Sequence, residues 1–191
     1  MVSKMFWNKY TYFLNAVHYC MWRSEIKQQN FVNKTVTPII SLLVKFFTTK
    51  EYQEKFFTRQ AIGQKEFDVW RVNKQTGLHI AEANHWFGYL YSCYPGYISF
   101  ILLALTMRYI HDMYFVVLLV VGLPIGIFYI PAYKAVFYKD RYLEYFKKFE
   151  KEDERWHKKW SRITTIFCIG AILMSLLGLA SMFFICIYFD L

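Results

Sequence analysis

Three long stretches of this 191-residue chain contain no charged side chain. They run from Trp86 to Met107, from Met113 to Tyr133 and from Ile163 to Phe189. A helix needs about 20 predominantly apolar residues to cross the hydrocarbon of a bilayer. Core helices of soluble proteins do not stay uncharged for so long. The sequence therefore predicts a mainly α-helical integral membrane protein with three transmembrane helices, at about residues 86–107, 113–133 and 163–189.

The chain divides by composition into an aromatic, basic N-terminal region (residues 1–85) and a transmembrane region (residues 86–191). Within the first region, residues 5–22 are dominated by Phe, Tyr and Trp, and their uncharged part is too short to span. Residues 35–44 form a second short apolar run, interrupted by Pro38. Aromatic side chains with polar tips favour the head-group layer. Both segments are therefore predicted to be interfacial helices, although residues 36–47 could also enter the membrane.

Two short alternating segments precede the first span. Phe67–Val72 and Leu78–Ala81 flank the turn-forming sequence Asn73–Gly77. Alternation on both sides of a Gly-containing turn of this length is typical of two paired strands. The sequence predicts a small β-hairpin here.

The connector at residues 134–161 carries aromatic side chains at helical spacing, with Lys and Glu on the other side. This pattern predicts one long amphipathic helix that lies on the inner membrane surface or projects as an arm. Four lysines of this helix would reach anionic phospholipid head groups, such as those of cardiolipin: Lys147, Lys148, Lys158 and Lys159.

The distribution of charge predicts the topology. Residues 1–85 hold 12 Lys and Arg against 6 Asp and Glu, and residues 134–162 hold 10 against 6. The turn between the first two spans has only Arg108 and Asp112. Because basic loops stay on the cytoplasmic or matrix side, the N-terminus and the connector are expected there, with the C-terminus opposite. The basic residues are dispersed among acids and lie next to spans, which favours lipid head groups over nucleic acid as their partners.

Small residues in the spans predict helix packing, because helices in lipid associate through close backbone approach. In the third span they are spaced four, three, four and three residues apart, so they form one seam: Thr164, Cys168, Ala171, Ser175 and Gly178. In the second span Gly122 and Gly126 are also four apart. Each set is expected to contact another helix, from this chain or from a partner.

One constellation could support catalysis. Glu82 with His85, and Glu154 with His157, both match the Glu-x-x-His spacing that di-iron bundles use. The supporting glutamates stand in no distinctive context, so these four residues are weak metal candidates. There is no phosphate-binding loop and no nucleophile elbow, and spans two and three contain no ionisable residue of the kind that transport uses. We expect no enzyme activity and no cofactor.

The favoured function is a non-catalytic accessory subunit of a larger membrane complex, for example a mitochondrial inner-membrane respiratory or ATP synthase complex. Its partners would be other membrane protein subunits and anionic phospholipid. Two alternatives stay open. One is a self-assembling pore or effector of a bacterial defence system in the bacterial inner membrane, and the other is a membrane di-iron oxidase-like enzyme.

Overall fold

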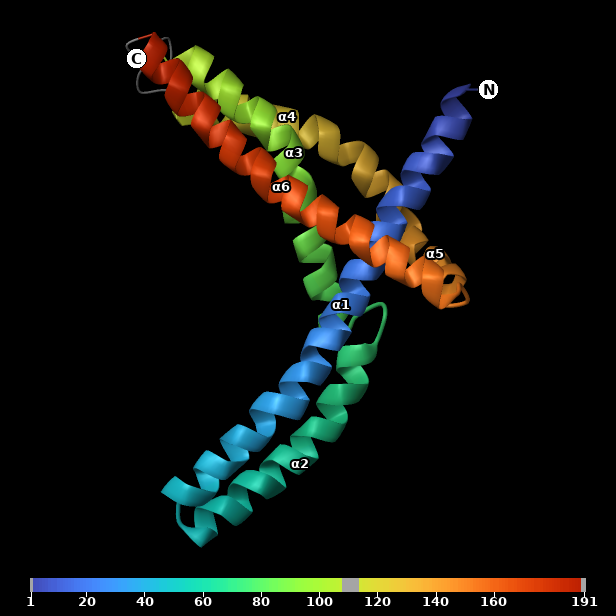
Figure 1. The fold of residues 1–191 in the computed structure, drawn as a ribbon, viewed down its shortest axis with the longest axis vertical. Coiled ribbons are helices and arrows are strands. Elements are labelled where there is room, and N and C mark those ends of the chain that lie inside the picture. The colour runs from blue at the N-terminus through green and yellow to red at the C-terminus, as the bar shows by residue number, and fades with distance from the viewer. Residues whose placement is uncertain (1, 108–113, 190–191) are drawn as a thin grey trace. The chain divides into compact units, whose positions relative to one another are not determined.

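A computed structural model describes residues 2–107 and 114–189, and these residues are almost all helical, with no strand among them. The elements, coloured along the chain in Figure 1, are α1 (Val2–Phe47), α2 (Lys50–Val72), α3 (Leu78–Thr106), α4 (Tyr114–Val136), the one-turn 3-10 helix η2 (Tyr138–Asp140), α5 (Arg141–Phe149) and α6 (Glu154–Tyr188). The charged turn predicted around Arg108 and Asp112 lies outside the described residues.

Three of these helices are long and apolar enough to cross a membrane: α3, α4 and α6. The three uncharged stretches of the sequence fall on these helices, although α3 begins eight residues before Trp86 and α6 nine residues before Ile163. The prediction of a mainly helical protein with three candidate membrane spans is confirmed at this level.

The chain forms two compact units. The span unit comprises Met1–Cys20 and His85–Leu191, and the hairpin unit comprises Met21–Asn84. Residues 1–20 therefore belong with the transmembrane region rather than with the rest of the N-terminal part. Each unit is described separately below.

The predicted β-hairpin is wrong. Phe67–Val72 is the last part of α2, and Leu78 begins α3. Only the turn between them lies where the sequence places it, and it joins two helices. The Asn73 side chain accepts hydrogen bonds there from the backbone N–H groups of Gln75 and Thr76, at 2.8 and 3.3 Å. Gly77 is the last residue of this turn. There is no room for a side chain there, because a Cβ at this position would lie 2.3–2.6 Å from three backbone carbonyl oxygens.

The predicted continuous connector helix is also wrong. The chain turns at Lys139 and Asp140, whose φ angles of 55° and 51° are left-handed, so α4 cannot continue into α5. A second break follows α5, and α6 begins at Glu154 with Asp153 as its N-cap. The Asp153 carboxylate accepts a hydrogen bond from the Trp156 N–H at 2.8 Å and caps the new helix.

The first helix is longer than predicted. The expected interfacial segments at 5–22 and 35–44 are parts of the single 46-residue helix α1, which continues through Pro38. Its early part contributes to the span unit and its later part to the hairpin unit. Two segments that look separate in the sequence therefore share one helix but have different surroundings.

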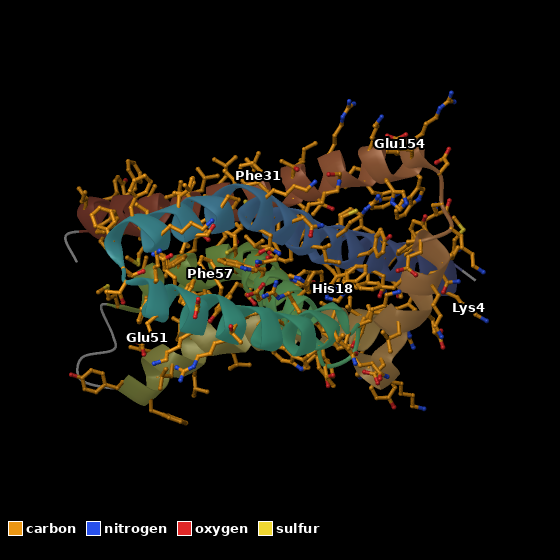
Figure 2. The ribbon with its side chains drawn as sticks, turned by 90° about the horizontal axis from the view of Figure 1, so that it is seen from below. Lys4, His18, Phe31, Glu51, Phe57 and Glu154 are labelled. Carbon is orange, nitrogen blue, oxygen red and sulfur yellow. The ribbon has the colours of Figure 1, made fainter. Side chains whose placement is uncertain are left out.

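The core of the span unit is built from aromatic rings around His18 of α1, the residue labelled in Figure 2. The imidazole is fully buried, and four rings lie with centroids 5.4–5.5 Å from its own. These rings belong to Phe87 of α3, to Phe137 and to Tyr142 and Phe146 of α5. Asn15, one turn earlier, donates to the backbone oxygen of Ala135 at 3.0 Å. The aromatic face of the connector is thus covered by α1 of the same chain.

Candidate functional site

The seam of small residues on α6 lies against α3 at Gly178. A Cβ added to Gly178 would lie 2.7 Å from the Phe100 ring and 3.3 Å from Cα of Tyr97. Thr164 and Ala171 are buried, whereas Cys168 and Ser175 are partly exposed. Part of the seam thus lies against another helix of the same chain.

The three candidate spans are also linked by hydrogen bonds from side chains to backbone oxygens of neighbouring helices. Tyr94 of α3 donates to the carbonyl oxygen of Phe167 in α6 at 2.8 Å. Ser99 of α3 donates to that of Val121 in α4, also at 2.8 Å. Such bonds between helices contribute to association where no water competes.

The two glycines of α4, Gly122 and Gly126, are exposed. Nothing in the described part of the chain comes within 4 Å of a Cβ added at Gly122 or Gly126. The side chains around them are exposed over most of α4, and only its last residues, including Ala132 and Val136, are buried. The face of α4 that carries these glycines is therefore open to lipid or to a helix from another chain.

All four predicted lipid-contacting lysines are exposed. Lys147 and Lys148 lie near the end of α5, where Lys148 stands 5.5 Å above the Tyr12 ring. Lys158 pairs with Glu154 at 2.9 Å, one turn along α6. Because an exposed pair of this kind is weak, Lys158 remains accessible to an anionic partner.

The metal candidates have other neighbours in the structure. Glu154 is paired with Lys158, while the His157 ring stacks on Tyr19 at 5.9 Å. The His85 ring packs edge-on against Tyr89 at 4.3 Å. Among the side chains that the structure describes, no three from His, Cys, Asp or Glu come together in a way that could hold a metal ion.

Glu82 instead lies beside Glu25 in the hairpin unit. Burial, followed by the charge of Glu82 and a hydrogen bond with it, raises the pKa of Glu25 above its ordinary value. Two neighbouring carboxyl groups of this kind share a proton more readily than they ionise together. The pair is thus a titratable feature of the hairpin unit.

An apolar cavity of about 490 Å³ lies within the span unit, where α1, α3, α4 and α6 meet. Phe13, Ile98 and Phe128 are among its walls. At its edge the hydroxyl groups of Tyr10 and Tyr91 are hydrogen-bonded at 2.8 Å. Burial, and then this bond, raise the pKa of Tyr10, so its hydroxyl stays protonated. The cavity is suited to an apolar group such as a lipid chain. It brings together residues from four distant parts of the sequence, so no local pattern could have revealed it.

The hairpin unit exposes an apolar surface that the sequence analysis did not identify. Between residues 31 and 47 of α1, nine large apolar side chains are exposed: Phe31, Val32, Val36, Ile39, Ile40, Leu42, Leu43, Phe46 and Phe47. At about 100° per residue these positions cover one half of the helix, and Thr35 is the only polar residue among them. We call this half the apolar face.

The other half of this helix segment carries small and polar residues. Asn33, Thr37 and Ser41 are partly buried there, and Ser41 donates to the backbone oxygen of Thr37 at 2.9 Å. The polar helix α2 runs alongside as the second arm of the hairpin (Figure 1). Gln53 of α2 donates to the backbone oxygen of Lys45 at 3.0 Å. The covered part of the hairpin is mixed, because Val44 of α1 and Phe57 of α2 are partly buried as well. The open half of α1 is almost wholly apolar.

The described residues form three surfaces that are suited to binding. The surfaces are the apolar face of the hairpin unit, the glycine-bearing face of α4 and the basic side chains of α5 and α6. Comparison of the chain with protein-family models, with curated proteins and with solved structures gives no match.

Proposed function

We propose that this protein is a non-catalytic structural subunit of a larger membrane complex, to which it contributes assembly contacts and lipid contacts. The observation that carries this proposal is the apolar face of residues 31–47. It lies on α1, which is not among the three candidate spans. A contiguous apolar surface of this kind is not left in water and normally marks an interaction site.

The neighbouring helix limits what can cover this face. α2 carries exposed charged residues, including Glu51 and Lys55, which pair at 2.7 Å. A helix with such a surface is costly to place in hydrocarbon. The hairpin unit would therefore keep α2 in water while its apolar face meets a partner subunit or the surface of the bilayer.

The open face of α4 supplies a second docking surface in this proposal. Gly122 and Gly126 would let a helix of a partner subunit approach closely, because no described residue of this chain comes within 4 Å of a Cβ added at either position. Neither surface requires a reacting group. Both are consistent with a subunit that holds other chains together.

The proposal includes a location. The excess of Lys and Arg at residues 1–85 and 134–162 favours the matrix or cytoplasmic side for these segments. A mitochondrial inner-membrane respiratory or ATP synthase complex is the leading setting. The bacterial inner membrane is the alternative.

The test is purification of the tagged full-length protein in a mild detergent, followed by a native gel and identification of the proteins in its band. We expect one large complex that contains several different polypeptides. A ladder or ring built from this chain alone would contradict the proposal and favour the self-assembling pore.

A pair of variants tests the apolar face directly. Leu43→Glu places a charge on the apolar face, whereas Thr58→Glu places the same charge at an exposed position of α2. We expect Leu43→Glu to release the protein from the complex and Thr58→Glu to leave the complex intact. Equal behaviour of the two variants would show that the apolar face is not the docking surface.

A further inference from the structure

A second cavity, of about 470 Å³, lies between the start of α1 and α5 within the span unit. Trp7, Asn8 and Thr11 line it from α1, and Arg141 and Lys148 line it from α5. It differs from the apolar cavity in chemistry, because polar and charged side chains make up much of its wall. We call it the basic cavity.

Thr11 is the most informative residue of the basic cavity. Its side chain is only 3% exposed. Its hydroxyl oxygen is buried and has no hydrogen-bond partner among the residues that the structure describes. Buried hydroxyl groups in native proteins are nearly always satisfied by protein, water or ligand. The position of Thr11 in the wall of the cavity therefore indicates a polar ligand group nearby.

The charges in the cavity favour an anion. Arg141 and Lys148 are seven residues apart on α5, which places them on one side of the helix, two turns apart. Glu144 is the one acid in the lining, so the cavity has a net positive charge. An Arg guanidinium offers a planar fork of donors that matches phosphate, and a Lys ammonium offers a point charge.

The location favours a lipid as the source of that anion. α5 begins five residues after the end of α4, a candidate span, so the cavity lies close to where a span leaves the hydrocarbon. Trp7 and Tyr145 line the cavity as well. Aromatic side chains of this kind are enriched at the level of the head groups.

We propose that the basic cavity binds the phosphate of an anionic lipid head group, with Arg141 and Lys148 as its charge partners and the Thr11 hydroxyl as a hydrogen-bond donor. This inference rests on the lipid contacts of the proposed function and narrows them to one site. It does not depend on which proteins surround the chain. The native-gel experiment and the lipid experiment can therefore fail separately.

The test uses the full-length protein in a mild detergent and measures the rise in Tm on titration with phosphatidic acid. Phosphatidylcholine with the same acyl chains and sodium phosphate are titrated in parallel. We expect a saturable rise with phosphatidic acid, and little change with phosphatidylcholine or with sodium phosphate. An equal response to both lipids would overturn the proposal. Inorganic phosphate that binds as tightly as phosphatidic acid would overturn the assignment to a lipid.

Charge variants test the site. Arg141→Gln and Lys148→Gln should each weaken binding of phosphatidic acid about tenfold, as expected for loss of one charge-assisted hydrogen bond. Lys151→Gln is the control, because it removes the same charge from an exposed position that follows α5 and lies outside the cavity lining. Glu144→Gln should strengthen binding. Equal weakening by Lys151→Gln and Lys148→Gln would show diffuse attraction by the basic surface and overturn the site.

Two variants of Thr11 separate the hydroxyl from packing. Thr11→Val keeps the shape and removes the hydroxyl, so it should weaken binding. Thr11→Ser retains the hydroxyl and should bind nearly as well as the wild type. The Tm of each variant without lipid reports its folding independently. Binding unchanged in Thr11→Val would exclude the hydroxyl from the site.

Discussion

The span unit and the hairpin unit use the same helix, α1, in opposite ways. In the span unit, residues 14–20 of α1 are buried among rings from α3, α5 and α6. In the hairpin unit, residues 31–47 turn their apolar half outward and keep small polar residues on the other half. The first arrangement is a protein core. The second is a surface that would be covered by a partner subunit or by lipid. Apolar content alone therefore does not distinguish a core helix from a docking helix.

The largest effect should come from matched truncations of one phenylalanine in each unit. Phe146 is fully buried against His18 and Tyr19, whereas Phe46 on the apolar face is 82% exposed. Phe146→Ala should lower the free energy of unfolding by about 3–5 kcal/mol. Phe46→Ala should change it by about 0.5 kcal/mol or less. Thermal unfolding in detergent measures both effects. Equal losses of unfolding free energy would contradict the contrast between the two units.

Gly77→Ala should have the next largest effect and should act on the hairpin unit. The added methyl group would meet three backbone carbonyl oxygens, so the turn between α2 and α3 must shift. Crowding of this kind costs about 1–3 kcal/mol. Hydrogen exchange should show faster exchange in α2, with little change at residues 11–20. Gly126→Ala, in open space, is the control and should leave exchange in α2 unchanged.

A smaller effect should follow from removal of one hydrogen bond between spans. Tyr94→Phe deletes the hydroxyl that donates to the Phe167 carbonyl oxygen. Single bonds of this kind between membrane helices contribute about 0.6 kcal/mol on average. The loss should appear as a lower Tm of the span unit. Tyr114→Phe, at a residue that is 84% exposed, should leave the Tm unchanged. Identical behaviour of the two variants would show that the bond does not hold α3 to α6.

The smallest effect should be a pH dependence confined to the hairpin unit. Because the pKa of Glu25 is raised in the folded state, the contribution of Glu25 to stability is fully present below its ordinary pKa of 4.5. It is lost as the pH rises through the raised pKa. Exchange of amides in the hairpin unit should therefore be slowed more by mild acid in the wild type than in Glu25→Gln, after correction for intrinsic exchange rates. The same pH response in both proteins would exclude Glu25.

The three spans could be predicted because the length of an uncharged run is a strong, local signal. The breaks in the connector could not be predicted in this way. The aromatic spacing from Tyr138 to Trp160 fits one helix, yet the left-handed backbone at Lys139 and Asp140 interrupts it. The sequence has no Gly or Pro there to mark the turn. Tyr142, Phe146 and Phe149 are buried in the structure, whereas Tyr138 is 48% exposed. Composition does not reveal whether such aromatic side chains meet lipid or protein.

The prediction of a β-hairpin was wrong for a related reason. Six residues that alternate between apolar and polar also fit the end of a helix, so Phe67–Val72 was ambiguous by periodicity alone. The turn residues carried the reliable part of the signal, because Asn73 and Gly77 have specific roles in the turn that forms. Only part of the basic cavity could be predicted from the sequence. Lys148 was predicted to contact lipid, but Thr11 and Arg141 become neighbours only through the fold.

The hydrogen bond from the Trp156 indole to the Tyr12 hydroxyl, 3.0 Å long, joins residues 144 positions apart. During translation, Tyr12 leaves the ribosome first and its partner emerges only after most of the chain has been made. Contacts between such distant residues form late, and surfaces that wait for them are prone to aggregation. We therefore expect the nascent N-terminal segment to be shielded, by lipid or by a chaperone, until α6 has been synthesised.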